Sequence, residues 1–279
     1  MNIKPIDYRV LWTQLVELSA QRRQFMKQAH LEDQWHGKAK EFDQRVSERW
    51  QQEDSSRVFL RKTLKKFPQA SVLDIGAGSG AWVSLMAEQA AKLTALDPSA
   101  SMLAQLRERV QREGLSNVEI IEGCWPDVEV TPHDIVFCSH AMYGASDLPI
   151  FIRAMQQVAT KSIILLIRAP RLDGLMSQAM QLVWGHPYDS PNYQIAMPIL
   201  WEMGIFPNVL MEEEHLWKPW SHPSLGEALL EMKTRLGLFN SDEWDQKLIA
   251  LLQDNLRFVD GEYVWPSGMR TALLFWDVK

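Results

Sequence analysis

The strongest constraint on the fold is a change of hydrophobic period at Ser71. From there to Pro170, short β-rich runs alternate with amphipathic segments, which is typical of parallel β-α-β units whose helices cover a sheet. The expected strands are residues 72–75, 92–96, 118–122, 134–139 and 162–167. Three helices are expected between these strands. The first follows Gly80, the second runs over residues 99–114, and the third has an apolar face made by Leu148, Phe151, Met155 and Val158. The sequence therefore predicts an α/β fold with a doubly wound sheet.

The segments before Ser71 and after Pro170 do not show this alternation. Helical spacing of apolar residues predicts that residues 1–67 are mostly helical, and Pro68 ends this extension. The remaining residues, 68–279, are expected to form the sheet domain, with insertions at about 171–206 and 218–269. After Pro170 the chain holds seven of its 12 tryptophans. Here we expect helices at 192–203, 224–236 and 242–256, a strand at 208–217, a hairpin around Asp260-Gly261 and a last strand at 270–278.

Charge and composition exclude several classes of protein. The formal net charge of −6 argues against a general nucleic-acid binder, although residues 1–70 carry 14 Lys and Arg against 9 Asp and Glu. The longest aliphatic run, Ile163 to Ile167, is far too short to cross a membrane, and the start of the chain lacks a signal-peptide pattern, so we expect a cytoplasmic protein without a membrane partner. Neither Cys124 nor Cys138 lies in a disulfide or zinc pattern.

The stretch "VLDIGAGSG", residues 72–80, places three glycines directly behind a strand. A strand, a glycine-rich turn and a following helix together form a general nucleotide cradle, and Gly76-x-Gly78-x-x-Ala81 also fits the dinucleotide fingerprint. Asp74 distinguishes the two uses, because its carboxylate would repel a pyrophosphate and attract a cation. A second strand ends in Asp97, about twenty residues later, from where a carboxylate can accept both hydroxyls of a ribose.

In this combination of motifs the sequence resembles the class I S-adenosylmethionine-dependent methyltransferases. The resemblance rests on D-x-G-x-G-x-G at Asp74 to Gly80, on "LDPSASML", and on the strand ends "EGCW" and "DIVFCSHAMYG". It implies a seven-stranded, mostly parallel sheet with an antiparallel last strand, S-adenosylmethionine as cofactor and S-adenosylhomocysteine as product. The cofactor contacts that it implies are Asp74, Gly76, Ala77, Gly78, Gly80, Asp97, Pro98, Met102, Cys124, Trp125 and Ser139.

Two features modify this picture. Many relatives carry an acidic residue or its amide where this chain has Cys124 and Trp125, so the exocyclic amine of adenine loses its usual acceptor unless Asp127 replaces it. The segment "DQWHGKAKEFDQRV" resembles a helix that covers the cofactor in many relatives, and this makes Trp35 a candidate lid residue. The alternative is that Trp35 packs two helices together.

The acceptor side is less defined. His140 follows the fourth strand and is a candidate base, with helix capping or packing as the alternative. Tyr143, His186, Tyr188 and Tyr193 are candidates for the acceptor pocket or for structural anchors. One further group, Trp217 with Trp220 and His222, is interpreted as packing. Another, Glu212–Glu214 with His215, lies on an expected strand, where alternate residues face opposite ways and do not converge on one ion. We therefore expect no metal.

The aromatic content beside the predicted cleft favours an apolar or planar small-molecule acceptor. The competing hypotheses are a methyltransferase acting on RNA or protein, recruited through the basic first 70 residues, and a catalytically silent protein that only binds the cofactor. A nicotinamide-dependent dehydrogenase is a further alternative, which Asp74 opposes. The oligomeric state does not follow from the sequence.

Overall fold

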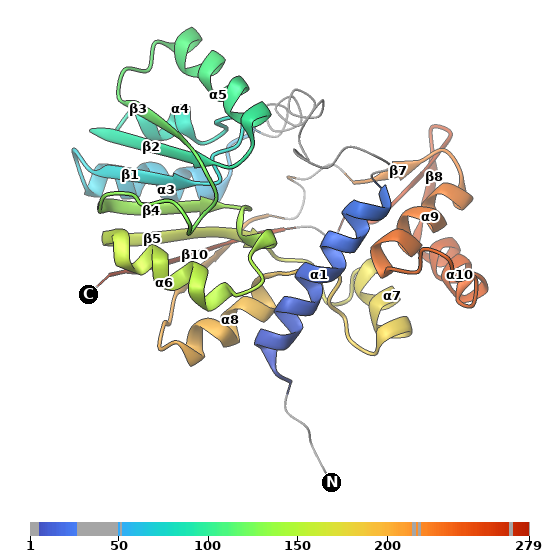
Figure 1. Ribbon diagram of the computed structural model, residues 1–279. Coiled ribbons are helices and arrows are strands. Elements are labelled where there is room, and N and C mark those ends of the chain that lie inside the picture. Colours follow the sequence, from blue (N-terminus) through green and yellow to red (C-terminus); the bar gives the residue numbers. More distant parts are fainter. Residues whose placement is uncertain are drawn as a thin grey trace.

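The structure is a computed structural model that describes residues 6–26, 50, 52–213, 216, 219–267 and 270–278. Figure 1 shows one large sheet with helices on both of its faces, and a second group of elements on the other side of helix α1. This architecture confirms the α/β class predicted from the sequence.

The central sheet has seven strands in the spatial order β3-β2-β1-β4-β5-β10-β6. All neighbours from β3 to β5 are parallel, whereas β10 runs antiparallel to both β5 and β6. The strand order reverses between β1 and β4, and ligands of open α/β sheets bind at the carboxyl ends of strands at such a point. The seven-stranded sheet with its antiparallel last strand is confirmed. The strands are β1 (Ser71–Ile75), β2 (Lys92–Asp97), β3 (Val118–Glu122), β4 (His133–Ser139), β5 (Ala159–Arg168), β6 (Asn208–Met211) and β10 (Thr271–Asp277).

The helices between these strands begin and end at local signals. Ser99 caps α5 (Ala100–Glu113) by accepting from the backbone N–H of Met102 at 3.2 Å, and Gly114 ends it with φ of 65°. Asp147 caps α6 (Leu148–Val158) in the same way. The predicted helix after Gly80 is short: α4 covers only Val83–Ala87. The residues between Gly80 and Val83 continue the glycine turn.

The two faces of the sheet have separate apolar cores. One core packs α6, α8 (Tyr193–Glu202) and α1 (Tyr8–Met26) against the sheet, and Trp12 of α1 is completely buried in it. The indole N–H of Trp12 donates to the carbonyl of Ala145 at 2.8 Å. Helices α3 (Ser55–Lys66), α4 and α5 cover the opposite face. Helix α1 is thus an integral part of the core.

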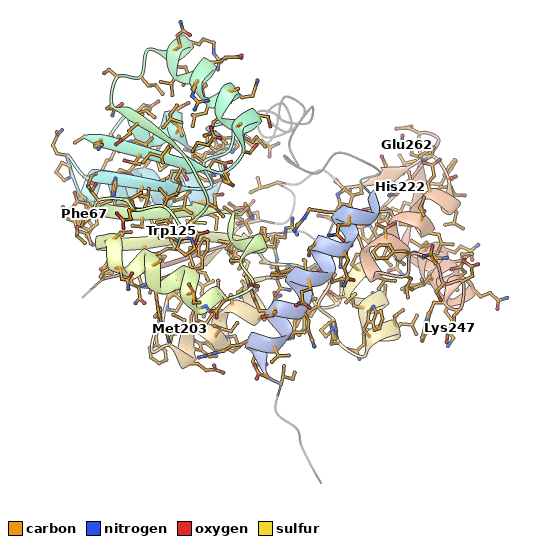
Figure 2. All side chains as sticks on the ribbon, viewed as in Figure 1. Phe67, Trp125, Met203, His222, Lys247 and Glu262 are labelled. Atoms are coloured by element: carbon orange, nitrogen blue, oxygen red, sulfur yellow. The ribbon has the colours of Figure 1, made fainter. Side chains whose placement is uncertain are left out.

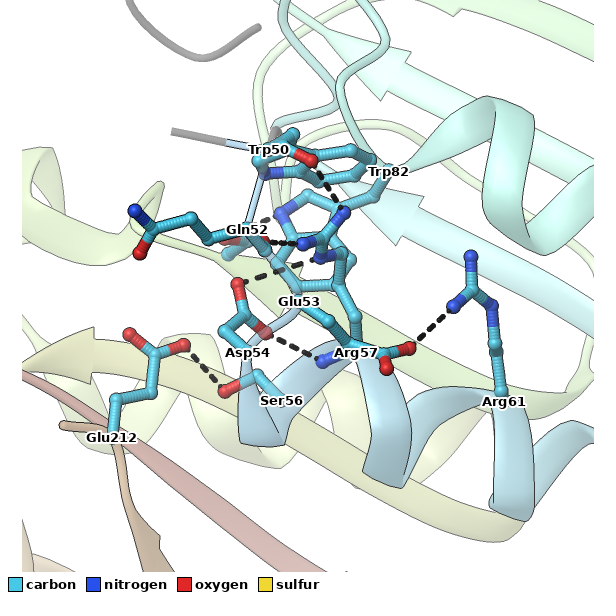
Figure 3. Close-up of polar contacts among 10 residues, drawn as sticks. Trp50, Gln52, Glu53, Asp54, Ser56, Arg57, Arg61, Trp82 and Glu212 are labelled. Atoms are coloured by element: carbon cyan, nitrogen blue, oxygen red, sulfur yellow. Dashed lines mark hydrogen bonds and ion pairs between the residues drawn. The ribbon is translucent and has the colours of Figure 1, made fainter. Parts of the chain in front are cut away.

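The start of α3 is held by a polar cluster (Figure 3). Asp54 caps the helix by accepting from the backbone N–H of Arg57 at 2.7 Å, and the guanidinium of Arg57 lies 5.0 Å from the ring centre of Trp50. Ser56 donates to the buried carboxylate of Glu212 at 2.6 Å, which ties α3 to the residue that follows β6. The first turn of α3 is therefore fixed both by its own cap, Asp54, and by a contact with Glu212.

The additions after β5 form a third core of their own around α9 and α10. The predicted hairpin is confirmed: Asp260 and Gly261 have φ of 50° and 85°, the positive values that a tight two-residue turn needs. The predicted helices are confirmed with slightly different ends. The additions comprise α7 (Leu175–Trp184), β7 (Ser221–His222), α9 (Leu225–Leu236), α10 (Asp245–Asn255), β8 (Arg257–Val259) and β9 (Glu262–Val264). The short helix η1 (Met142–Gly144) lies outside the additions, between β4 and α6.

Three features differ from the prediction. Helix α7 was not expected, and its N-cap, Gly174, offers no side chain to signal its start. The strand expected at 208–217 stops at Met211, and the carboxylate of the next residue, Glu212, accepts from Ser56 on α3. The two-residue strand β7, which pairs with β9 in a second small sheet, is too short to show a period in the sequence. The division at residue 67 stays a prediction.

Candidate functional site

Two acidic side chains end neighbouring strands of the sheet. Asp74 lies near the end of β1, Asp97 ends β2, and the two strands are parallel neighbours. The carboxyl ends of parallel strands meet at one edge of a sheet, so both acids belong to the same crevice. Both residues are buried, with exposed fractions of 1% for Asp74 and 8% for Asp97. The structure therefore brings together the two acids that the sequence singled out.

Asp74 is the group with unused binding capacity. Its Oδ2 atom is buried and has no hydrogen-bond partner in the part of the chain that the structure describes. Burial, together with the charge of Asp97, raises the pKa of Asp74 to about 8. A buried carboxylate without a counter-charge is costly, and a cation placed beside it would lower its pKa again. A cation bound beside Asp74 would therefore stabilise its ionised form.

Asp97 already holds the glycine turn. Its Oδ2 accepts from the backbone N–H of Gly78 at 2.9 Å, and its Oδ1 accepts from that of Ser99 at 2.8 Å. The acid therefore shapes the glycine turn and joins it to the start of α5.

The three glycines of the turn serve different purposes. All have positive φ, at 74°, 57° and 84° for Gly76, Gly78 and Gly80. A Cβ atom on Gly76 would lie 2.1 Å from Cβ of Ala141, and one on Gly80 would lie 2.4 Å from Leu106. Only at Gly78 would a Cβ atom meet nothing within 4 Å. A ligand can therefore approach the backbone at Gly78, whereas the outer two glycines are required by packing inside the protein.

The backbone amides of the turn are not available to a phosphate. The N–H groups of Gly76 and Ala77 both donate to the carbonyl of Leu96, at 2.7 and 3.0 Å. Gly80 donates to the carbonyl of Ala77 at 3.0 Å, and Gly78 donates to Asp97. Phosphate cradles depend on amides that point at the ligand, so this arrangement disfavours a pyrophosphate, as do the two acids.

The residues predicted at the adenine side lie in different environments. Cys124 is exposed as a residue, but the partial burial of its thiol, together with the charges of Asp127 and Asp97, raises the pKa of the thiol. Trp125 is buried in the core beneath α6, where its indole N–H donates to the carbonyl of Phe151 at 3.3 Å (Figure 2). The structure therefore does not bring the Trp125 side chain into the crevice.

Three further predicted contacts complete this side. Met102 is buried on the first turn of α5, and Pro98 is exposed just before it. Trp35 and the segment around it lie outside the described residues. Their cofactor roles stay predictions.

Trp82 is a buried residue that contacts a predicted site residue, and the sequence did not indicate this contact. Its indole N–H donates to the Ser139 hydroxyl at 3.0 Å, so this side chain fixes a predicted cofactor contact at the end of β4. Its ring packs against Phe137 and meets the edge of Trp50 at 5.0 Å. The available signal was its place two residues after the third glycine, on the turn that leads into α4.

His140 and Tyr143 form one connected group. The Tyr143 hydroxyl accepts from the backbone N–H of Arg168 at 2.7 Å and lies 2.8 Å from Nδ1 of His140. Nε2 of His140 lies 3.4 Å from the Thr271 hydroxyl. Burial raises the pKa of Tyr143, which keeps its proton in place. Both ring nitrogens of His140 thus have partners inside the protein.

The aromatic clusters of the additions pack mainly against the protein. His186 and Tyr188 stack with ring centres 6.1 Å apart, and burial lowers the pKa of His186. Tyr188 and Tyr193 are half-buried against the same core as Tyr143. Trp220 meets the edge of Trp265, and this accords with the interpretation of that group as packing; Trp217 lies outside the described residues.

Within the described ranges, no three His, Cys, Asp or Glu side chains gather into a group that could hold a metal ion. None of the helices described there combines the length and the apolar character that a membrane span requires.

Comparison with known proteins bears on the sheet domain. Residues 72–162 match the protein family described as "Methyltransferase domain". The YcgJ protein from Bacillus subtilis has a similar structure: its TM-score is 0.52, its identity 18%, and the alignment covers 80% of this chain and 97% of that one. The chain therefore carries a methyltransferase domain with the fold of the class I S-adenosylmethionine-dependent enzymes, which confirms the resemblance drawn from its motifs.

Two curated relatives are protein-L-isoaspartate O-methyltransferases. That of Methanoregula boonei is 38% identical over 66 residues, or 24% of this chain and 30% of the relative. That of a Synechococcus species is 30% identical over 88 residues, or 30% of this chain and 35% of the relative. The chain thus matches about a third of the length of these relatives.

Proposed function

We propose that this protein is a methyltransferase that uses S-adenosylmethionine to methylate a small molecule. The observation that carries the proposal is the buried, unpartnered oxygen of Asp74 in the same crevice as the open backbone of Gly78. A ligand that combines a positive charge with a nucleoside fits both, and Asp97 adds acceptor capacity for ribose hydroxyls. A pyrophosphate ligand fits neither the acids nor the occupied amides.

The residues present suit the cofactor. Asp74 would hold its cationic amino acid part, Gly78 would lie against it, and Asp97 would accept from the ribose. When bound, the cofactor supplies a methyl group on a positively charged sulfur. The contribution of the chain is to orient the acceptor and exclude water, and positioning of this kind can supply up to roughly 7 to 11 kcal/mol of a reaction barrier.

His140 acts in this proposal as a positioning residue. Its Nδ1 faces the Tyr143 hydroxyl and its Nε2 faces Thr271, so neither nitrogen is poised as an open base. An acceptor that needs little deprotonation, such as a thiol, an amine or a stabilised carbanion, is consistent with this arrangement. The half-buried aromatic rings of Tyr188 and Tyr193 support a small acceptor with an apolar part.

A protein acceptor is the second candidate, because both curated relatives are named as methylating isoaspartate in proteins. Those matches leave at least 70% of this chain without a counterpart. Methylation of an isoaspartyl peptide by the purified protein would favour this candidate over a small molecule.

Calorimetric titration with S-adenosylhomocysteine, S-adenosylmethionine and NADH tests the proposal. We expect micromolar or tighter binding of the first two and none of NADH. Asp97→Asn, which retains one oxygen for Gly78, is expected to weaken binding of S-adenosylhomocysteine about 100-fold, because hydrogen bonds to a charged acceptor each contribute roughly 1.5 to 3 kcal/mol. Asp254→Asn, on the exposed face of α10, is the matched control. Binding of NADH with no response to either nucleoside would refute the proposal.

A further inference from the structure

An arginine stands at the carboxyl end of β5, beside the predicted methyl-transfer site. Arg168 is the last residue of β5, which neighbours β4, and β4 neighbours β1. Adjacent strands are about 4.8 Å apart, and residues rise about 3.3 Å along a strand. The register aligns Ile75 with Cys138 and Cys138 with Leu165, three residues before Arg168, so the backbone of Arg168 lies roughly 14 Å from the end of β1. A small molecule together with the long arginine side chain can span this distance from the crevice of Asp74.

The guanidinium of Arg168 lies on an aromatic ring that is itself fixed. Its central carbon is 4.5 Å from the ring centre of Tyr143, and the Tyr143 hydroxyl is held by the backbone of Arg168 and by His140. Within the described part of the chain, no carboxylate pairs with this guanidinium. A half-buried arginine that is oriented by a ring and lacks an ion pair is available to an anionic ligand.

A second arginine faces the same region from α1. Nη2 of Arg22 donates to the carbonyl of Asp189 at 2.5 Å, while its Nε is buried with no partner among the described residues. Burial lowers the pKa of Arg22 to about 10; the charge of Asp189 opposes this shift, and the positive charges of Arg235 and Arg168 add to it. The guanidinium groups therefore lie near enough to repel one another.

The acids near these arginines are largely committed elsewhere. Glu231 pairs with Nε of Arg235 at 2.6 Å, and Arg235 itself lies 3.6 Å from the ring centre of Trp220. Asp189 is buried and accepts from the hydroxyl of Ser190 at 2.9 Å. The three arginines Arg22, Arg168 and Arg235 carry three positive charges, and Glu231 and Asp189 carry two negative charges. This group of five side chains therefore has a net charge of one positive unit.

We propose that Arg168, with Arg22 beside it, binds a carboxylate on the methyl acceptor. The inference rests on the proposed function and specifies its substrate class: a small, partly apolar molecule with an anionic end. A planar guanidinium can donate two parallel hydrogen bonds to a carboxylate, which selects for that group and also orients the molecule. The sequence alone predicted only the apolar or planar part of such an acceptor.

A matched pair of probes tests this inference. We expect 2-naphthoate to bind at least about tenfold more tightly than 2-naphthamide, measured by ligand-observed NMR with and without saturating S-adenosylhomocysteine, because a charge-assisted bidentate pair is worth more than a neutral hydrogen bond. Arg168→Gln should remove the preference, and Arg168→Lys should keep part of it. Arg153→Gln, on the exposed face of α6, should leave it unchanged.

The outcomes separate this inference from the proposed function. Equal affinities for the two probes, no binding of either, or a preference that survives Arg168→Gln would overturn the carboxylate site even when S-adenosylhomocysteine binds normally. Failure of S-adenosylhomocysteine to bind would count against the proposed function alone, since the naphthoate preference is also measured without it. If circular dichroism shows that Arg168→Gln does not fold, Arg22→Gln provides the same comparison, with a smaller expected loss.

Discussion

The crevice at β1 and β2 differs from the additions around α9 in whether a buried charged side chain has a partner of opposite charge. In the crevice, Asp74 is fully buried with an oxygen that nothing in the described chain satisfies. In the additions, Lys233 is largely buried and lies within 2.7 and 2.8 Å of the carboxylates of Asp242 and Asp245. The charge of Lys233 is thus balanced by acids of the fold, whereas the only charge that acts on Asp74 among the described residues is that of another acid, Asp97.

The largest effect is expected from breaking the glycine turn. Gly76 and Gly185 have the same φ of 74°, but only at Gly76 would a Cβ atom clash, 2.1 Å from Ala141. Gly185→Ala should cost about 1 kcal/mol, the penalty for a left-handed residue. Gly76→Ala should cost about 3 kcal/mol or more, since overpacking adds to it. Chemical denaturation measures both free energies of unfolding, and equal losses would show that Ala141 yields without cost.

Asp74 and Asp245 should respond to neutralisation with opposite signs. The pKa of Asp74 is raised to about 8 in the folded protein, so its destabilising effect is absent at low pH and grows as pH rises from about 4 to 8. Asp74→Asn should therefore raise the free energy of unfolding at pH 8 by about 1 kcal/mol, the lower end of the cost of an unsatisfied buried group. Asp245→Asn should lower it, because the ion pair with Lys233 is lost. The measurement is thermal unfolding at pH 5 and pH 8.

The same titration links ligand binding to pH. A cationic ligand requires ionised Asp74, so its binding releases a proton below pH 8. The affinity for S-adenosylhomocysteine should therefore rise about tenfold per pH unit between pH 6 and 7.5. Calorimetry in buffers of different ionisation enthalpy counts the released proton. A pH-independent affinity would show that the charge of Asp74 does not hold the ligand.

The smallest effect is expected from two tryptophans. Trp82→Phe removes the bond to Ser139 and should weaken S-adenosylhomocysteine binding several-fold, because that hydroxyl loses its orientation and a hydrogen bond contributes roughly 1 kcal/mol. Trp125→Phe removes a bond to the carbonyl of Phe151 within the core, and should lower stability without changing affinity. Binding titrations and melting curves of both variants separate the two roles. The reverse result would place Trp125 in the site.

The sequence predicted whatever depends on neighbours along the chain. The strand period, the helix expected over residues 99–114 and the Asp260-Gly261 turn are local, and the structure confirms each. Helix α7 lacks such a signal at Gly174 and is fixed by packing against α9 and α10.

The same division holds within the site. Asp74 and Asp97 follow from the motif and from the meeting of parallel strand ends. The burial of Trp125, the bond from Trp82 to Ser139, and the place of Arg168 on Tyr143 depend on residues 25 to 57 positions apart. Contacts of this range are set by the folded sheet, so a single sequence does not reveal them.

Strand β10 has a consequence for how the molecule assembles on the ribosome. It lies between β5 and β6, yet more than a hundred residues separate it from β5 along the chain. During synthesis, β6 has no neighbour in the sheet until Thr271–Asp277 has emerged from the exit tunnel. The additions around α9 are synthesised before β10 and have their own core, so they can fold while β6 still lacks its partner strand. The nascent chain thus exposes an unpaired strand edge late in translation, when chaperones are most useful to it.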